Sequence, residues 1–420
     1  QLPWELMTSL GVTRTSTEPA KLAALVVRLM ASDRVKSMVK EKSPQELLDH
    51  YHLAIGEHLT NLGVLLVGTA TDRARLGCAP VVQAIKYDER GVKVDKLAWD
   101  DHALSPIELV DAIAREVPDF RERYELPVGL FREAVPAYDT VVVRELLVNA
   151  LVHRPYTQRG DIFLNLHPDR LEVVNPGRLP LGVTPANILH ASRRRNNALA
   201  RIFHDLILME REGSGFDMMY EKLLESGRPV PTAREGSDSV HVVVPRRVVH
   251  HGVIRLLGEA DQRYQLTQRE RITLGLLATT EAATATELTE RLGLREPSDL
   301  RHWMGRLTDL GLVKQTGRTR ATRYFVPPEL LRATGLDLRT TLHRVQPHRL
   351  RALILEDIER YPHSSSTEVH GRIGSEIPVR TFRRALVQLV EEGLVDATGE
   401  RRWRRYAPAA SIGQGGEDGQ

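Results

Sequence analysis

The feature that most restricts the fold of this chain is an internal repeat in its last third. Residues 307–326, LTDLGLVKQTGRTRATRYFV, recur as residues 389–408, LVEEGLVDATGERRWRRYAP, at a constant spacing of 82 residues. Both copies carry a leucine four residues before a glycine, a Leu-Val pair directly after it, and a Thr-Gly pair followed by arginines and a tyrosine. Such a match predicts two similar small domains in tandem, which we place at residues 262–330 and 345–408.

Each copy follows two segments with helical patterning and ends in an arginine-rich hairpin, an order typical of a winged helix-turn-helix domain. The second helix of such a domain enters the major groove of DNA, and arginine suits both phosphates and guanine edges. Winged helices also mediate protein contacts, so that alternative stays open. The candidate DNA-binding residues are Arg301, Arg306, Arg318, Arg320, Arg323, Arg380, Arg383, Arg384, Arg402 and Arg405.

The charge of the chain is unevenly placed. The net charge is only +3, yet residues 261–410 hold 25 arginines and lysines against 19 aspartates and glutamates. A local excess of positive charge favours a double-stranded DNA partner, although an excess of this size is also common on a solvated surface.

Composition restricts the broad class. A chain of 420 residues with 41% hydrophobic and 27% charged residues is predicted to form about two to four globular domains. No apolar run approaches the roughly 18 to 20 residues that span a membrane, and the N-terminus lacks a basic region followed by an apolar core. We therefore expect a cytoplasmic protein without a membrane partner. The single cysteine, Cys78, excludes an internal disulfide.

The residues before the repeat alternate between helical and strand patterns. Residues 1–135 are interpreted as an α/β N-terminal connecting region, with helices in the first 60 residues and strands at 62–68, 79–87 and 92–99. Residues 136–250 give the order helix, strand pair, arginine-rich loop, helix, glycine turn, helix and strand, which predicts an α+β sandwich. The tail, residues 409–420, is predicted to be disordered.

One segment, RELLVNALVHRPY at residues 144–156, carries three polar residues within an apolar helix. The four-residue spacing of Glu145, Asn149 and His153 places them on one helix face, while the apolar residues around them predict packing on several sides. A buried carboxylate then needs a partner. The plain interpretation, in which Glu145 and Asn149 are only hydrogen-bonded to neighbouring backbone, stays open, and His153 is interpreted as structural.

Two more motifs follow in order. A strand ends in LEVVNPGRLP, which contains Asn175 and Gly177, and REGSGF places Gly213 and Gly215 before a helix. This order resembles the nucleotide-binding fold of the gyrase, Hsp90, histidine-kinase and MutL group. It is more similar still to the divergent ATPase domain of bacterial proteins labelled RecG-like or Schlafen-type AAA-4. The resemblance covers about residues 45–246.

The resemblance implies a Bergerat-type α/β sandwich that binds ATP with Mg²⁺. Asn149 would give Mg²⁺ a neutral oxygen, and Glu145 would orient or deprotonate the attacking water. The glycine turn would let backbone amides approach phosphate at a helix N-terminus, although it could equally be a plain connector. Asn175 stands where the wider group has an aspartate, so weaker base selectivity is expected. The implied cofactor-binding residues are Asn149, Asn175, Gly177, Gly213 and Gly215.

No GxxxxGK[ST] sequence occurs in the chain, which excludes a helicase motor of the P-loop kind. We expect an ATP-binding, DNA-binding regulator whose nucleotide state alters homo-oligomer assembly or DNA engagement, in transcription control or phage defence. The rival is a scaffold with a degenerate nucleotide fold and protein-binding winged helices. Relatives of this kind commonly carry an AlbA-like N-terminal domain that is missing here, and because the chain starts with Gln1 we expect a fragment or a processed product.

Overall fold

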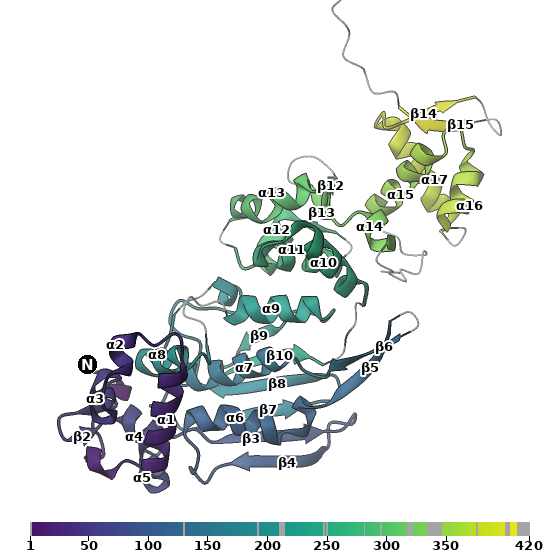
Figure 1. The fold of residues 1–420 in the computed structure, drawn as a ribbon. Coiled ribbons are helices and arrows are strands. Elements are labelled where there is room, and N and C mark those ends of the chain that lie inside the picture. The colour runs from purple at the N-terminus through teal and green to yellow at the C-terminus, as the bar shows by residue number, and fades with distance from the viewer. Residues whose placement is uncertain are drawn as a thin grey trace, which may run out of the picture. The chain divides into compact units, whose positions relative to one another are not determined.

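The computed structural model describes residues 2–128, 131–190, 193–209, 215–246, 248, 251–280, 282–294, 296–316, 322–333, 347–374, 377–399 and 404–409. The chain divides into two compact units. The first contains Gln1–His250 with Thr267–Ile272 and Thr289–Asp299, and the second contains His251–Leu266, Thr273–Leu288 and Leu300–Gln420. Figure 1 gives the labels of the helices and strands.

A six-stranded mixed sheet forms the centre of the first unit (Figure 1). The only parallel pair among its neighbours is β3 with β7, and the other neighbours run antiparallel. The sheet draws strands from both sides of residue 136, and one hydrophobic core extends from Val12 to Val244. The strand order is β4 (Lys93–Trp99), β3 (Val82–Tyr87), β7 (Ile162–Leu166), β8 (Arg170–Pro176), β10 (Ser239–Pro245) and β9 (Thr232–Glu235).

Helices cover one face of this sheet, as the strand alternation requires. Ile162, Leu164 and Leu166 are buried, whereas the residues between them are only half-buried, so every second side chain of β7 faces the helices. Helices α6 (Pro106–Glu116) and α7 (Thr140–His153) lie over the sheet, and α9 (Gly215–Glu225) packs against α7 (Figure 1). The mixed α+β class predicted for this part of the chain is confirmed.

The N-terminal residues add a helical cluster and correct one prediction. Residues 62–67 of the strand predicted at 62–68 lie in a helix that ends at Val67. The prediction was wrong because a short run that is apolar on all sides does not distinguish a buried strand from a buried helix. Thr60 caps this helix by accepting a hydrogen bond from Gly63 N at 3.0 Å. The elements are α1 (Pro19–Ala31), α2 (Ser37–Lys40), α3 (Pro44–His50), β1 (Ala54–Ile55), β2 (His58–Leu59), α4 (Asn61–Val67), α5 (Ala70–Arg75) and, later, α8 (Asn197–Asp205).

A separate antiparallel hairpin, β5 (Arg123–Val128) and β6 (Phe131–Pro136), precedes α7 and was not predicted from the sequence. The buried guanidinium of Arg228 ties its base to the rest of the unit. Arg228 Nε donates to Arg246 O and Arg228 Nη2 donates to Tyr124 Oη, both at 3.0 Å.

After residue 250 the chain forms two successive sets of helices, each with an antiparallel hairpin. In both sets, a helix and the hairpin after it recur at the spacing of the sequence repeat. The first set is α10 (His251–Tyr264), α11 (Gln268–Ala278), β11 (Ala283–Thr284), α12 (Ala285–Arg291), α13 (Arg301–Asp309), β12 (Lys314–Thr316) and β13 (Arg323–Phe325). After α14 (Pro328–Ala333) come α15 (Pro347–Arg360), α16 (Ser366–Gly374), α17 (Val379–Glu391), β14 (Val395–Thr398) and β15 (Arg405–Pro408).

Within the part of the chain that the structure describes, no helix combines the length and the apolar character needed to span a bilayer. The predicted disordered tail lies outside the described residues, apart from Ala409.

Candidate functional site

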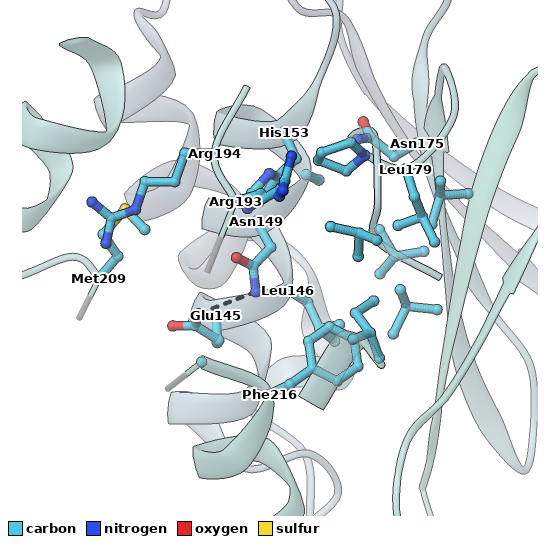
Figure 2. A pocket seen from close by; sticks show the side chains of 18 of the residues that line it. Glu145, Leu146, Asn149, His153, Asn175, Leu179, Arg193, Arg194, Met209 and Phe216 are labelled. Carbon is cyan, nitrogen blue, oxygen red and sulfur yellow. Dashed lines mark hydrogen bonds between the residues drawn. The ribbon is translucent and has the colours of Figure 1, made fainter. Parts of the chain in front are cut away.

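A cavity with an empty volume of about 1000 Å³, part of it open to solvent, lies on the helix side of the sheet (Figure 2). Helix α7, strands β8 and β10, and the segment between β8 and α8 supply most of its wall. Both apolar and polar side chains line the cavity. The lining residues include Glu145, Asn149, His153, Asn175, Arg193, Arg194, Met209, Gly215 and Phe216.

Glu145, Asn149 and His153, which form the polar stripe of α7, line this cavity. Asp139 caps the helix by accepting hydrogen bonds from the first turn, at 2.8 Å from Val141 N, and thereby fixes where the helix begins. Glu145 is only 4% exposed, and Asn149 Nδ2 donates to Glu145 Oε1 at 3.0 Å. The buried carboxylate therefore has the side-chain partner that its burial requires, one turn away on the same helix.

Gly215 brings the N-terminus of α9 against that carboxylate. A Cβ atom added to Gly215 would lie 1.9 Å from Glu145 Oε1, so no other residue fits without displacing Glu145. The helix N-terminus carries unpaired N–H groups and a partial positive charge, which favours an anion nearby. Gly213 lies outside the described residues, so the other half of the predicted glycine turn has no structural description.

The two residues predicted at the end of β8 differ in position. Asn175 lines the cavity, and its buried Oδ1 has no hydrogen-bond partner among the described residues. Gly177 is not among the lining residues. It has a φ of +87°, and an added Cβ would lie 2.4 Å from Pro155 Cγ, so glycine is needed there for backbone conformation and packing.

The arginine-rich loop closes the C-terminal end of α7. Arg195 Nε donates to His153 O at 3.0 Å, and Asn196 Nδ2 donates to Val152 O at 2.8 Å. Burial, together with the neighbouring guanidiniums of Arg195 and Arg194, lowers the pKa of His153 to about 4. His153, interpreted from sequence as structural, therefore lies in the cavity as an uncharged imidazole.

The donor set of the cavity fits Mg²⁺ that arrives with phosphates. Asn149 Nδ2 is occupied by Glu145, which leaves Asn149 Oδ1 as the oxygen that can reach a cation. The described residues contain no group of three or more His, Cys, Asp or Glu side chains that could hold a metal ion. Mg²⁺ commonly takes one or two protein oxygens and fills its remaining positions with phosphate oxygens and waters, so a single carboxamide beside a carboxylate is compatible with it.

The arginines predicted to bind DNA fall into three groups. Arg301, Arg380, Arg383 and Arg384 have exposed side chains. Others have partners or lower exposure: Arg306 Nη2 donates to Tyr264 O at 2.5 Å, Arg405 pairs with Glu368 at 2.8 Å, and Arg323 is half-buried. Arg318, Arg320 and Arg402 lie outside the described residues.

Sequence reasoning missed several lining residues. Arg193 and Arg194 belong to the RRR run, which was noticed as a loop but given no role, and Phe216 follows the glycine turn directly. The basic run beside a predicted phosphate site was the signal available for the arginines. Nothing in the sequence marked Phe216 or Met209 as lining residues.

Comparison with known proteins supports a divergent ATPase-like fold. Residues 160–244 match the family model described as "Putative ATP-dependent DNA helicase recG C-terminal". That segment contains Asn175 and Gly215, whereas Glu145 and Asn149 precede it. No curated protein matches the chain.

Among solved structures, the chain is similar to the crystal structure of the DIP2311 protein from Corynebacterium diphtheriae. The two share 19% sequence identity with a TM-score of 0.65, and the match covers 97% of this chain and 70% of that protein. At this identity the similarity shows the fold alone.

Proposed function

We propose that the first unit binds ATP with Mg²⁺ in the cavity beside α7 and can hydrolyse it. The observation that carries the proposal is the meeting of three separate segments in the wall of one cavity. They contribute Glu145 and Asn149, Asn175, and Gly215. The family description supports ATP as the nucleotide.

Each residue has a role that follows from its position. Glu145 would orient or deprotonate the water that attacks the terminal phosphate, and Asn149 Oδ1 would hold Mg²⁺. The N-terminus of α9 at Gly215 faces the phosphates, where unpaired N–H groups favour anions. Arg193 and Arg194 supply positive charge in the wall, which a triphosphate requires.

Calorimetry with Mg-ATP tests the binding step, and phosphate release tests the hydrolysis step. Glu145→Gln keeps the shape of the side chain but removes the base, so we expect binding to remain and hydrolysis to fall by about a hundredfold or more. Asn149→Ala should weaken binding in the presence of Mg²⁺ much more than in its absence. Glu259→Gln, an exposed change on α10, is the matched control. Equal turnover by the wild type and Glu145→Gln would remove the catalytic assignment.

We propose further that the two helix-and-hairpin sets are winged helix-turn-helix units that bind double-stranded DNA. The supporting observation is the surface of α17. Its apolar side packs into the core through Phe382 and Leu386, while Arg380, Arg383 and Arg384 are exposed and have no acidic partner among the described residues. Helix α13 offers fewer unpaired arginines. Of its two candidates, only Arg301 has no partner among the described residues, because Arg306 donates to Tyr264 O.

A salt titration of duplex binding by the full chain tests this proposal. Arginine–phosphate contacts release counterions, so affinity should fall steeply between about 50 and 200 mM salt. Reversing Arg383 and Arg384 to Glu should weaken binding and flatten the salt dependence, while ATP binding stays unchanged. Reversing Arg90 and Arg121, two exposed arginines of the first unit, is a control with the same change in charge. No binding at low salt would favour the protein-binding scaffold.

The regulatory part of the proposal is that nucleotide state changes DNA affinity or homo-oligomer assembly. Duplex affinity and molar mass by light scattering, each with ATP, with ADP and without nucleotide, measure both outcomes. The scaffold alternative predicts the same values in all three conditions. Transcription control and phage defence are proposed contexts that rest on the family resemblance alone.

A further inference from the structure

The cavity contains two buried polar atoms that the protein leaves without partners. These are His153 Nδ1 and Asn175 Oδ1, neither of which has a hydrogen-bond partner among the described residues. Leaving such an atom unpaired is unfavourable, and most buried polar groups in native proteins are paired. Both residues line the same cavity, so a rotation of either side chain would present its unpaired atom to a ligand with complementary donors and acceptors.

The position of His153 assigns it to one end of that ligand. Eight residues separate it from Glu145 on α7, which corresponds to a rise of about 12 Å along the helix axis. Figure 2 shows Glu145 at one end of the polar stripe and His153 at the other, with Asn149 between them and Asn175 at the His153 end. If Glu145 marks the terminal phosphate, His153 faces the part of the nucleotide farthest from it.

The chemistry of the imidazole agrees with this assignment. Burial and the neighbouring arginines hold the pKa of His153 near 4, so the ring is uncharged at neutral pH. A neutral imidazole offers one hydrogen-bond donor and one acceptor but no positive charge to attract a phosphate. Arg193 and Arg194 in the same wall carry that positive charge. Its backbone is held in place, because Arg195 Nε donates to the His153 carbonyl.

We propose that His153 is a nucleoside-binding residue, which hydrogen-bonds through Nδ1 to the sugar or the base while Asn175 Oδ1 accepts a second hydrogen bond from the base. The inference rests on the proposed nucleotide site and adds a residue whose role the sequence motifs did not supply. The shared chemistry is that of an uncharged hydrogen-bonding group, either a ribose hydroxyl or a purine edge.

Calorimetry of the full chain with Mg-ATP, Mg-ADP and adenosine tests the assignment. We expect His153→Ala to weaken all three by the same factor of about ten, which corresponds to one hydrogen bond of about 1.4 kcal/mol. Loss of affinity for ATP and ADP with adenosine unchanged would overturn the proposal, because it would place His153 on the phosphates. Comparison of ATP with 2′-deoxy-ATP and GTP separates a sugar contact from a base contact.

Two conservative variants separate a ligand contact from a structural role. The amide of Asn branches from Cγ, as Nδ1 of histidine does, whereas the amide of Gln lies one atom farther out and corresponds to Nε2. His153→Asn should therefore retain most of the affinity and His153→Gln should not, at similar melting temperatures. Equal binding by both variants would overturn the role of Nδ1. Wild-type protein that binds none of the nucleotides would overturn the ATP site itself, whereas wild-type binding that His153→Ala leaves unchanged would overturn only this inference.

Discussion

Replacing Gly215 by alanine tests the geometry of the candidate site most directly. The new Cβ would lie 1.9 Å from Glu145 Oε1 and 2.7 Å from Glu145 Cδ, far inside van der Waals contact. All three of the nearest atoms belong to the Glu145 side chain and none to backbone, so the carboxylate must rotate away or the start of α9 must shift. Rotation would also separate Glu145 Oε1 from Asn149 Nδ2.

The cost in stability follows from these contacts. A strained side-chain rotamer costs about 0.5–1.5 kcal/mol and a lost hydrogen bond a further 0.5–1.5 kcal/mol. We therefore expect Gly215→Ala to lower the free energy of unfolding by about 1–3 kcal/mol in urea denaturation. Nucleotide hydrolysis should fall much more, by a hundredfold or more, because the displaced carboxylate is the proposed base.

A double-mutant cycle locates the cause. Glu145→Ala removes the three atoms nearest to the new Cβ, so Gly215→Ala should cost less than about 0.5 kcal/mol in that background. Gly258→Ala is the matched control, because it lies within α10 with no atom within 4 Å of an added Cβ, and it should stabilise the chain by up to about 1 kcal/mol. An equal cost of Gly215→Ala with and without Glu145 would refute the contact.

Three further predictions follow from single residues. Unfolded histidine gains a proton below its ordinary pKa of about 6.5, whereas folded His153 stays neutral down to about pH 4. The free energy of unfolding should therefore fall by up to about 3 kcal/mol as the pH is lowered from 6.5 to 4. Urea midpoints that fall by the same amount in His153→Asn would contradict this. Gly177→Ala should cost about 1–3 kcal/mol by urea denaturation, more than Gly91→Ala, since both have positive φ but only Gly177 packs against Pro155. Asn175→Asp should raise the preference for ATP over GTP in calorimetry, because a carboxylate only accepts and an amide can also donate.

The amphipathic and capped elements of the fold were predictable from the sequence. The stripe of α7 is set by spacing, and Ser105 with Pro106 marks the start of α6, where the structure has the complete capping box with Glu108. Residues 62–68 were assigned wrongly because every residue of α4 is buried, which removes the periodicity on which the distinction between strand and helix depends. The membership of β3 and β4 in the same sheet as β8 depends on pairing between distant segments, which local pattern does not encode.

The candidate site, too, was predictable only in part. Glu145 and Asn149 were predicted because polar residues stand out in an otherwise apolar helix. Asn175 and Gly215 were predicted because their motifs follow in a recognisable order. Gly177 was assigned to the nucleotide, but its φ and its contact with Pro155 give it a structural reason to be glycine. Arg193 and Arg194 reach the cavity only through the path of the loop after β8, which sequence spacing does not determine.

The polar groups that line the cavity differ in whether the protein itself pairs them. Glu145 is paired with Asn149 and approached by a helix N-terminus, so its burial is compensated within the protein. His153 Nδ1 and Asn175 Oδ1 are not compensated, and together they cost on the order of 2–6 kcal/mol. Against a net stability of about 5–15 kcal/mol for a typical domain, that cost is large. An apolar residue at either position would remove this cost, and a nucleoside bound in the cavity is the partner that we propose for the two atoms.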